Sequence, residues 1–228
     1  MKKNCLLCFL LFFSCHSALA GESLDSLLNV LDKTIKEADT YVQIKENKLH
    51  ELKKEARKTP PFSVERYNLN NDIYLEYKAY SSDSALHYLN ENMLLARQLN
   101  DKERELKIQL ELSYLLSSIG MYMEAADILN SIDRQTLPSS LLGHYYTCYE
   151  HVYFEAGAAQ PRYKMFASRY VKLSHAYRDS MQITLDPSSA TYLWLRETQL
   201  REAGKYDEAL EFSDRRLAES SFGTPQYA

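Results

Sequence analysis

Apolar side chains recur every three or four residues over a long stretch near the start of the chain. This spacing places them on one face of a helix and predicts a long amphipathic helix within residues 21–60, broken near Asp39-Thr40. The stripe consists of Leu24, Leu28, Leu31, Ile35, Ala38, Val42, Leu49, Leu52 and Ala56. Two partners are compatible with it: a second copy of the chain, in a coiled-coil homodimer, or the helices that follow.

The first helix is expected to end at Thr59-Pro60-Pro61, because proline lacks an amide donor and disfavours helical geometry in the residue before it. Beyond it, paired amphipathic segments predict about four antiparallel helical hairpins over residues 61–228. The expected pairs are 63–80 with 83–99, 102–119 with 122–133, 139–156 with a partner ending near Met181, and 187–203 with a partner ending near Ala218. The fold class is therefore all-α. The last hairpin either ends in a frayed terminus or precedes a further helix.

One six-residue motif occurs twice at the expected turns. Gly120-Met121-Tyr122-Met123-Glu124-Ala125 and Gly204-Lys205-Tyr206-Asp207-Glu208-Ala209 are identical at four of six positions. In each, we expect glycine to turn the chain, tyrosine to fill the corner, glutamate to lie in the positive first turn of the next helix, and alanine to allow close packing. A third turn is expected at Gly157 and Pro161, and Ser82-Asp83-Ser84-Ala85 replaces glycine in the first hairpin. The residues assigned to the glycine turns are Gly120, Tyr122, Ala125, Gly157, Gly204, Tyr206 and Ala209.

These turn residues, with Leu112, Ser113 and Leu200, make the chain resemble a tetratricopeptide repeat (TPR) protein. The resemblance implies antiparallel hairpins stacked as a right-handed solenoid behind a long N-terminal helix. The stretch from Leu24 to Ile35, with that from Tyr41 to Lys54, is similar to the start of exported regulators of gut Bacteroidota. That similarity implies an extracytoplasmic domain followed, in full family members, by a membrane span, a coiled coil and a cytoplasmic DNA-binding output.

The first twenty residues have the pattern of a secretory signal peptide. Lys2 and Lys3 precede an apolar run, and Ala18-Leu19-Ala20 suits cleavage before Gly21. The alternative is lipoprotein processing at Cys15. Either route predicts export, to the periplasm or the extracytoplasmic face of the inner membrane.

The cysteines indicate the compartment in which the protein works, and the net charge bears on its partners. Of the 4 cysteines, Cys5, Cys8 and Cys15 fall in the signal segment, which leaves Cys148 without a partner for an internal disulfide. This fits a bacterial periplasmic protein better than a secreted eukaryotic one. The formal net charge of −4 becomes more negative once Lys2 and Lys3 are removed, so nucleic acid is not an expected partner of this domain.

The sequence offers few residues that could bind a metal or catalyse a reaction. His144, Cys148, His151 and Glu155 recur at helical spacing and form a weak candidate metal site. Zinc sites of this kind usually draw ligands from two segments, and the tyrosines interleaved here at 145, 146, 149 and 153 favour a packing role. The chain has no Gly-rich phosphate loop, nucleophile elbow or paired catalytic acids. We therefore expect a non-enzyme without a cofactor.

In the TPR arrays that the chain resembles, the first helix of each hairpin lines a concave binding face. Counting back from each turn gives the groove residues expected here. They are Tyr67, Asn70, Tyr74, Tyr77 and Lys78, then Lys107, Leu110, Tyr114, Ser117 and Ser118, then His144, Thr147, His151, Phe154 and Glu155, and last Thr191, Trp194, Thr198, Arg201 and Glu202. An aromatic, polar groove suits an extended peptide, a protein segment or a glycan. The competing interpretation is that the rings, drawn from 18 tyrosines, fill space between helices.

Two functional hypotheses follow. The first is an interaction and sensing domain of an envelope signalling or regulatory protein, which binds its ligand in the groove and has any membrane tether outside this chain. The second is a structural adaptor that assembles an envelope complex through protein contacts alone.

Overall fold

The computed structural model describes residues 24–160 and 162–219, and every regular element in these residues is a helix. The all-α class is therefore confirmed. The predicted signal peptide and the residues after Glu219 lie outside the described residues. The chain divides into two compact units, one ending at Glu51 and one beginning at Leu52.

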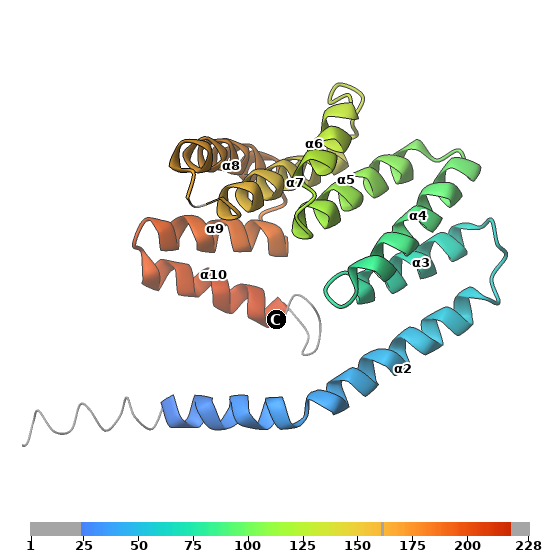
Figure 1. Ribbon diagram of the computed structural model, residues 1–228, viewed down its shortest axis with the longest axis horizontal. Coiled ribbons are helices and arrows are strands. Elements are labelled where there is room, and N and C mark those ends of the chain that lie inside the picture. Colours follow the sequence, from blue (N-terminus) through green and yellow to red (C-terminus); the bar gives the residue numbers. More distant parts are fainter. Residues whose placement is uncertain (1–23, 161, 220–228) are drawn as a thin grey trace, which may run out of the picture. The chain divides into compact units, whose positions relative to one another are not determined.

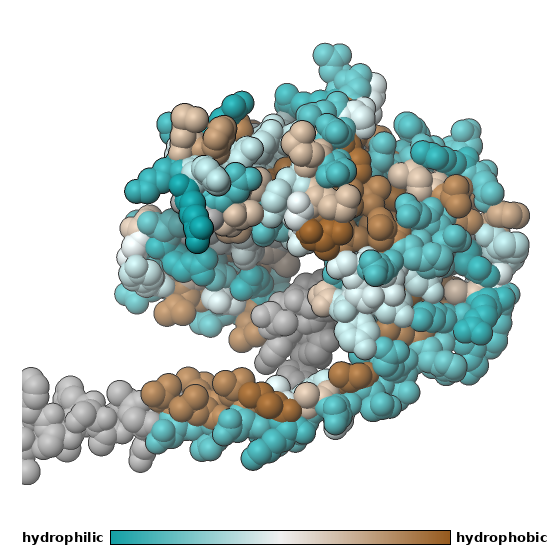
Figure 2. Space-filling model, in the orientation of Figure 1, coloured by the Kyte–Doolittle hydropathy of each residue, from teal (hydrophilic) through white to brown (hydrophobic). Residues whose placement is uncertain are grey.

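The first unit contains the long amphipathic helix in two pieces. Residues 24–36 are helical, Glu37 forms a turn, and α2 (Ala38–Ala56) follows and continues into the second unit. The break thus lies slightly before the expected position. The apolar stripe is exposed as far as Val42, for example by 53% at Leu31 and 61% at Ile35, and Figure 2 shows this part as a brown band, whereas Leu49 and Ala56 are buried. Neither the dimer nor the packing interpretation is tested by this, and both stay predictions.

The second unit is built from four helical hairpins (Figure 1). They pair α3 (Val64–Tyr77) with α4 (Ser82–Gln98), α5 (Lys102–Ser118) with α6 (Tyr122–Ser131), α7 (Ser139–Ala158) with α8 (Lys164–Thr184), and α9 (Ala190–Glu202) with α10 (Tyr206–Glu219). Consecutive hairpins contact each other through α4 and α5, through α5 and α6 with α7, and through α8 and α9. The expected hairpins are thus present, with bounds close to those predicted.

Side chains cap three of the helix starts. Ser63, Asp101 and Ser189 adopt extended backbone geometry just before α3, α5 and α9, and each accepts a hydrogen bond from the amide three residues on, at 3.0–3.2 Å. These bonds satisfy amides that have no partner inside the helix. The caps explain why the helices begin where they do.

The turns follow the motif only in part. Gly120 and Gly204 have positive φ angles of 88° and 75°, as expected for glycine turns, and Asn100 takes the same role at 53°. The assignment of Gly157 was wrong, because this residue is buried inside α7. A Cβ added there would lie 3.3 Å from Cβ of Tyr170, so the glycine lets α7 approach α8. Tyr206 is also unlike the expectation, since its ring is 65% exposed and fills no corner.

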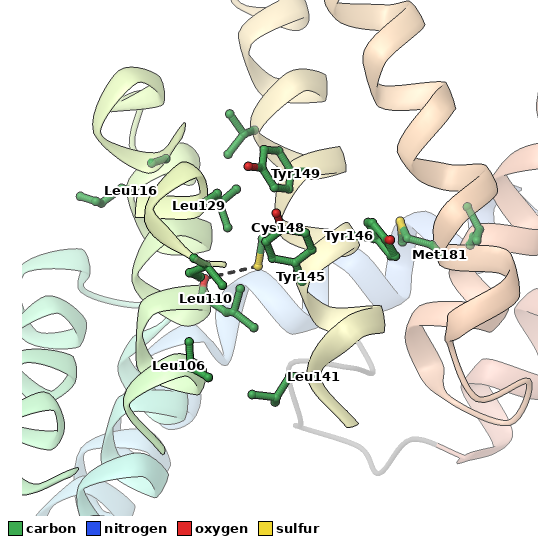
Figure 3. Packing of buried hydrophobic residues seen from close by; sticks show 14 residues of the cluster. Leu106, Leu110, Leu116, Leu129, Leu141, Tyr145, Tyr146, Cys148, Tyr149 and Met181 are labelled. Atoms are coloured by element: carbon green, nitrogen blue, oxygen red, sulfur yellow. Dashed lines mark hydrogen bonds between the residues drawn. The ribbon is translucent and has the colours of Figure 1, made fainter. Parts of the chain in front are cut away.

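The main hydrophobic core joins α5, α6 and α7 and receives Met181 and Leu195 from the next two helices (Figure 3). Tyr149 is central to it. Its ring stacks on Tyr177 at 4.7 Å between centroids, and its hydroxyl donates to Asn130 Oδ1 at 2.9 Å. Tyr145 and Tyr146 are buried beside it. The tyrosines of α7 at positions 145, 146 and 149 therefore serve packing, as the competing interpretation proposed.

Candidate functional site

A cleft of about 860 Å³ opens in the second unit. One side is formed by α5 and α7 with Lys78 at the end of α3, and the other side by α9 and α10. Both sides contribute aromatic and polar side chains. The lining residues are Lys78, Glu111, Tyr114, His144, Thr147, His151, Phe154, Glu155, Ala190, Thr191, Trp194, Ser213, Arg216 and Leu217.

Helix α7 has two different faces, and this positions the cleft. Positions 144, 147, 151, 154 and 155 share one face through helical spacing and line the cleft. The opposite face carries Tyr145, Tyr146 and Tyr149, which are buried in the core. Core packing on one side thus fixes the orientation of the polar face on the other.

Glu111 lies in the cleft as a largely buried carboxylate, with a side chain only 14% exposed. Its Oε2 accepts hydrogen bonds from the Tyr74 hydroxyl at 2.6 Å and from Lys78 Nζ at 3.0 Å. Burial alone would raise the pKa of Glu111, but Lys78 and the other neighbouring groups outweigh burial and hold the pKa below its usual value. Glu111 is therefore an ionised acceptor with a fixed orientation.

The two histidines of the cleft favour their neutral forms. Burial lowers the pKa of His144, although Glu111 Oε1, 3.7 Å from its Nε2, opposes this shift. Burial and the charge of Lys78 lower the pKa of His151 to about 4. Both rings are thus neutral at pH 7, and Lys78 is the counter-charge of Glu111.

Aromatic rings form the adjoining wall. Tyr114 and His151 stack with ring centroids 3.9 Å apart and planes within 8° of parallel, and Ser118 Oγ lies 2.9 Å from Nε2 of His151. Lys78 Nζ lies 4.3 Å from the Tyr114 centroid. Trp194 lines the same cleft from α9, so a planar or extended ligand would meet aromatic side chains from α5, α7 and α9.

The structure brings only some of the expected groove residues together. Tyr114, His144, His151 and Trp194 line the cleft, as do Lys78, Thr147, Phe154, Glu155 and Thr191. Tyr67, Asn70, Tyr74 and Tyr77 do not line it, because α3 turns this face inward and leaves each of them 8% exposed or less. The rest, which are also absent from the lining, are Lys107, Leu110, Ser117, Ser118, Thr198, Arg201 and Glu202.

Several residues that line the cleft were not predicted from the sequence. Glu111 was missed because counting from the turn selected its buried neighbour Leu110. An acidic residue between Leu110 and Leu112, one helical turn before Tyr114, was the available signal. Arg216 and Leu217 were missed because they lie on α10, the second helix of its hairpin, where the TPR rule places no groove residues.

The weak candidate metal ligands do not converge. Cys148 is buried and its thiol donates to the Leu110 carbonyl at 3.3 Å, away from the cleft (Figure 3). Burial raises the pKa of this thiol well above its usual value. Within residues 24–160 and 162–219, no cluster of three potential ligands has the geometry to hold a metal ion.

Comparison with known families agrees with this architecture. Residues 35–228 match the profile of the family described as the SusR N-terminal TPR domain. The chain belongs to this family. The SusR N-terminal TPR domain is a non-catalytic helical repeat domain of SusR-like regulators, and TPR domains in general mediate protein–protein interaction. The resemblance found in the sequence is thereby confirmed. No curated protein and no solved structure matches the chain.

In the part of the chain that the structure describes, no helix of this SusR-type domain combines the length and the apolar character needed to cross a bilayer.

Proposed function

We propose that this SusR-type TPR domain is the extracytoplasmic sensing part of a regulator, and that the cleft between α7 and the α9–α10 hairpin receives its ligand. The observation that carries the proposal is the buried carboxylate of Glu111, held by Tyr74 and Lys78 in a cleft with aromatic walls. An oriented acceptor next to ring faces suits a ligand that offers hydroxyl or amide donors beside flat apolar surfaces. A short peptide, a protein segment and a glycan all have this chemistry.

Trp194 gives a direct test, because it is the only tryptophan in the chain and it lines the cleft. Titration with neutral oligosaccharides and with short peptides should produce a saturable change in its emission for one of the two classes. Glu111→Gln keeps the shape of the side chain but removes the charge, and should weaken binding about tenfold, equivalent to about 1.4 kcal/mol. Glu219→Gln, an exposed position at the end of α10, is the matched control.

A different result would contradict binding in the cleft. A ligand that binds the domain with unchanged Trp194 emission and unchanged affinity in Glu111→Gln would place binding elsewhere on the domain. It would then favour the adaptor hypothesis, for which the exposed side chains of Met165, Phe166 and Val171 on α8 offer an apolar contact surface.

The extracytoplasmic location rests on the signal-peptide pattern and has its own test. The mature protein should begin at Gly21, as measured by mass spectrometry of its N-terminus. An intact Met1 would contradict export, and a lipid on Cys15 would indicate lipoprotein processing instead.

A further inference from the structure

A second pocket, of about 230 Å³, lies where the last turn of α2 meets α3 and α4. It is separate from the central cleft, with which it shares no lining residue. Asn70 lines it with a side chain that is 94% buried (6% exposed) and that forms no hydrogen bond with the described residues. The amide nitrogen and oxygen themselves stay accessible, so they can meet a polar group that enters the pocket.

Two arginines line the same pocket and are held by their own chain. Arg66 donates from Nε to Thr59 Oγ1 at 2.9 Å and from Nη2 to the Thr59 carbonyl at 3.0 Å. Arg57 uses only Nε, which donates to the Lys53 carbonyl at 3.3 Å. Each guanidinium therefore keeps donors available, and the fork of such donors matches the two oxygens of a carboxylate.

The charges around the pocket are unbalanced. Arg57 and Arg66 face a single acid, Glu91, whereas Lys53 donates to the Tyr77 hydroxyl at 2.6 Å, and His87 and Tyr88 complete the polar lining. No ion pair joins Glu91 to Arg57 or Arg66 in the part of the chain that the structure describes. The lining is thus positive, although the whole chain has a formal net charge of −4. A positive pocket on an acidic protein favours an anion.

We propose that this pocket binds the carboxylate of a small organic anion, with the Asn70 amide and the guanidinium groups of Arg57 and Arg66 as hydrogen-bond donors. The size suits one carboxylate with a few attached atoms. Glu91 selects for a single negative charge, because it would repel a dianion such as phosphate more strongly than a carboxylate. Two sources carry this chemistry: a free organic acid and the C-terminus of a peptide. The inference does not depend on what the central cleft binds.

The test compares acetate, N-acetyl-Ala-Ala and N-acetyl-Ala-Ala amide as probes at pH 7.5 and constant ionic strength. Thermal unfolding and calorimetric titration measure binding to the repeat domain within the full chain. We expect saturable stabilisation by one or both carboxylates and none by the amide. Binding of acetate and not of the peptide identifies a free acid as the source, and stronger binding of the peptide identifies a C-terminus. No saturable binding of either carboxylate, or equal binding of the amide, would overturn the proposal.

Variants locate the site. Arg57 is exposed, so Arg57→Gln should leave the fold intact and weaken carboxylate binding at least tenfold. Arg97→Gln removes the same charge from an exposed position of α4 outside the pocket and should leave binding unchanged. Asn70→Asp, which places a negative charge in the pocket, should abolish binding. Unchanged affinity in Arg57→Gln, or a carboxylate-dependent change in Trp194 emission, would move binding to another site and refute the assignment.

Discussion

The same six-residue turn motif occurs at Gly120 and Gly204, but its two copies lie in different surroundings. Locally they are alike. In both, the glycine has a positive φ angle, and the next residue donates its amide to a carbonyl in the last turn of the preceding helix at 2.9 Å, from Met121 to Leu116 and from Lys205 to Leu200. Neither glycine has an atom within 4 Å of an added Cβ. The motif thus specifies the turn by itself.

Burial separates the helices that begin at the two copies, although the closing alanine is buried in both, with Ala125 0% and Ala209 6% exposed. After Gly120, Ala125 and Leu129 are completely buried, because α6 packs against both α5 and α7. After Gly204, Leu210 is 61% and Leu217 48% exposed, and within the described residues α10 packs on α9 alone. The comparison teaches that a turn motif determines hairpin geometry, whereas the neighbouring hairpins determine how much apolar surface is buried.

The largest expected effect comes from apolar truncation in the two second helices. Leu129→Ala should lower the free energy of unfolding by about 2 to 5 kcal/mol, because it leaves a cavity in the core. Leu210→Ala removes an exposed side chain and should change it by less than about 0.5 kcal/mol. Chemical denaturation of both variants measures the difference. Equal losses would mean that α10 is covered in solution as α6 is.

The stability of the fold is also expected to depend on pH, through His151 on α7, the helix against which α6 packs. The folded pKa of His151, about 4, lies below the usual value of 6.5, so its contribution to stability is complete above pH 6.5 and is lost as the pH falls towards 4. The loss amounts to at most about 3 kcal/mol. The lowered pKa of Glu111 has the same sign, but its contribution disappears only as the pH falls below the usual glutamate range.

Denaturant midpoints between pH 7 and pH 4 test this. His151→Phe keeps a ring against Tyr114 and should flatten the profile over this range, whereas His175→Phe, at an exposed position of α8, should leave the profile unchanged. A profile that is equally steep in His151→Phe would assign the pH dependence to other groups.

The two glycine turns should lose the same amount of stability when a branched side chain replaces the glycine. Gly120→Val and Gly204→Val should each cost about 1 to 3 kcal/mol, because a branched side chain disfavours positive φ while the space around each glycine is open. The two losses are measured by denaturation and should agree within error. A clearly larger loss at Gly120 would show that the surrounding packing contributes to the turn after all.

The smallest effect is expected at Ser113 and Glu197, which precede Gly120 and Gly204 by the same number of residues. Ser113 Oγ donates to the buried Ala125 carbonyl at 3.0 Å, so Ser113→Ala should cost about 1 kcal/mol. Its counterpart, Glu197, has a side chain 15% exposed and pairs with Arg216 at 3.2 Å, but that arginine is 32% exposed, so Glu197→Ala should cost less, about 0.5 kcal/mol. Thermal unfolding at matched protein concentration distinguishes them. A larger effect at Glu197 would show that its ion pair stabilises the domain more than the Ser113 hydrogen bond does.

The helices were well predicted because their signals are local. Helical periodicity, the proline pair before α3 and the glycines after α5 and α9 placed the hairpin ends within a few residues. Gly157 shows the limit. With Pro161 following, it had the pattern of a turn, and only the approach of α8, seen at Tyr170, reveals that it is a packing glycine.

The cleft was predicted unevenly for a similar reason. The face of α7 was correct in full, since its polar and aromatic positions separate clearly around the helix. On α3 the count began from Tyr80, where no glycine marks the turn, and most of the selected residues lie in the core. The contributions of α10 depend on how the last hairpin docks, which no local pattern encodes.

Buried Cys148 has a practical consequence for measuring motion in this domain. A thiol that is fully buried, with a pKa far above neutral, reacts slowly with maleimides and oxidants. In a chain that starts at Gly21, it is the one native cysteine. Engineered cysteines on α5 and α10, which both contribute to the cleft lining, can therefore carry a fluorescent donor and acceptor without removal of Cys148. Distances across the cleft then become measurable in an otherwise native chain.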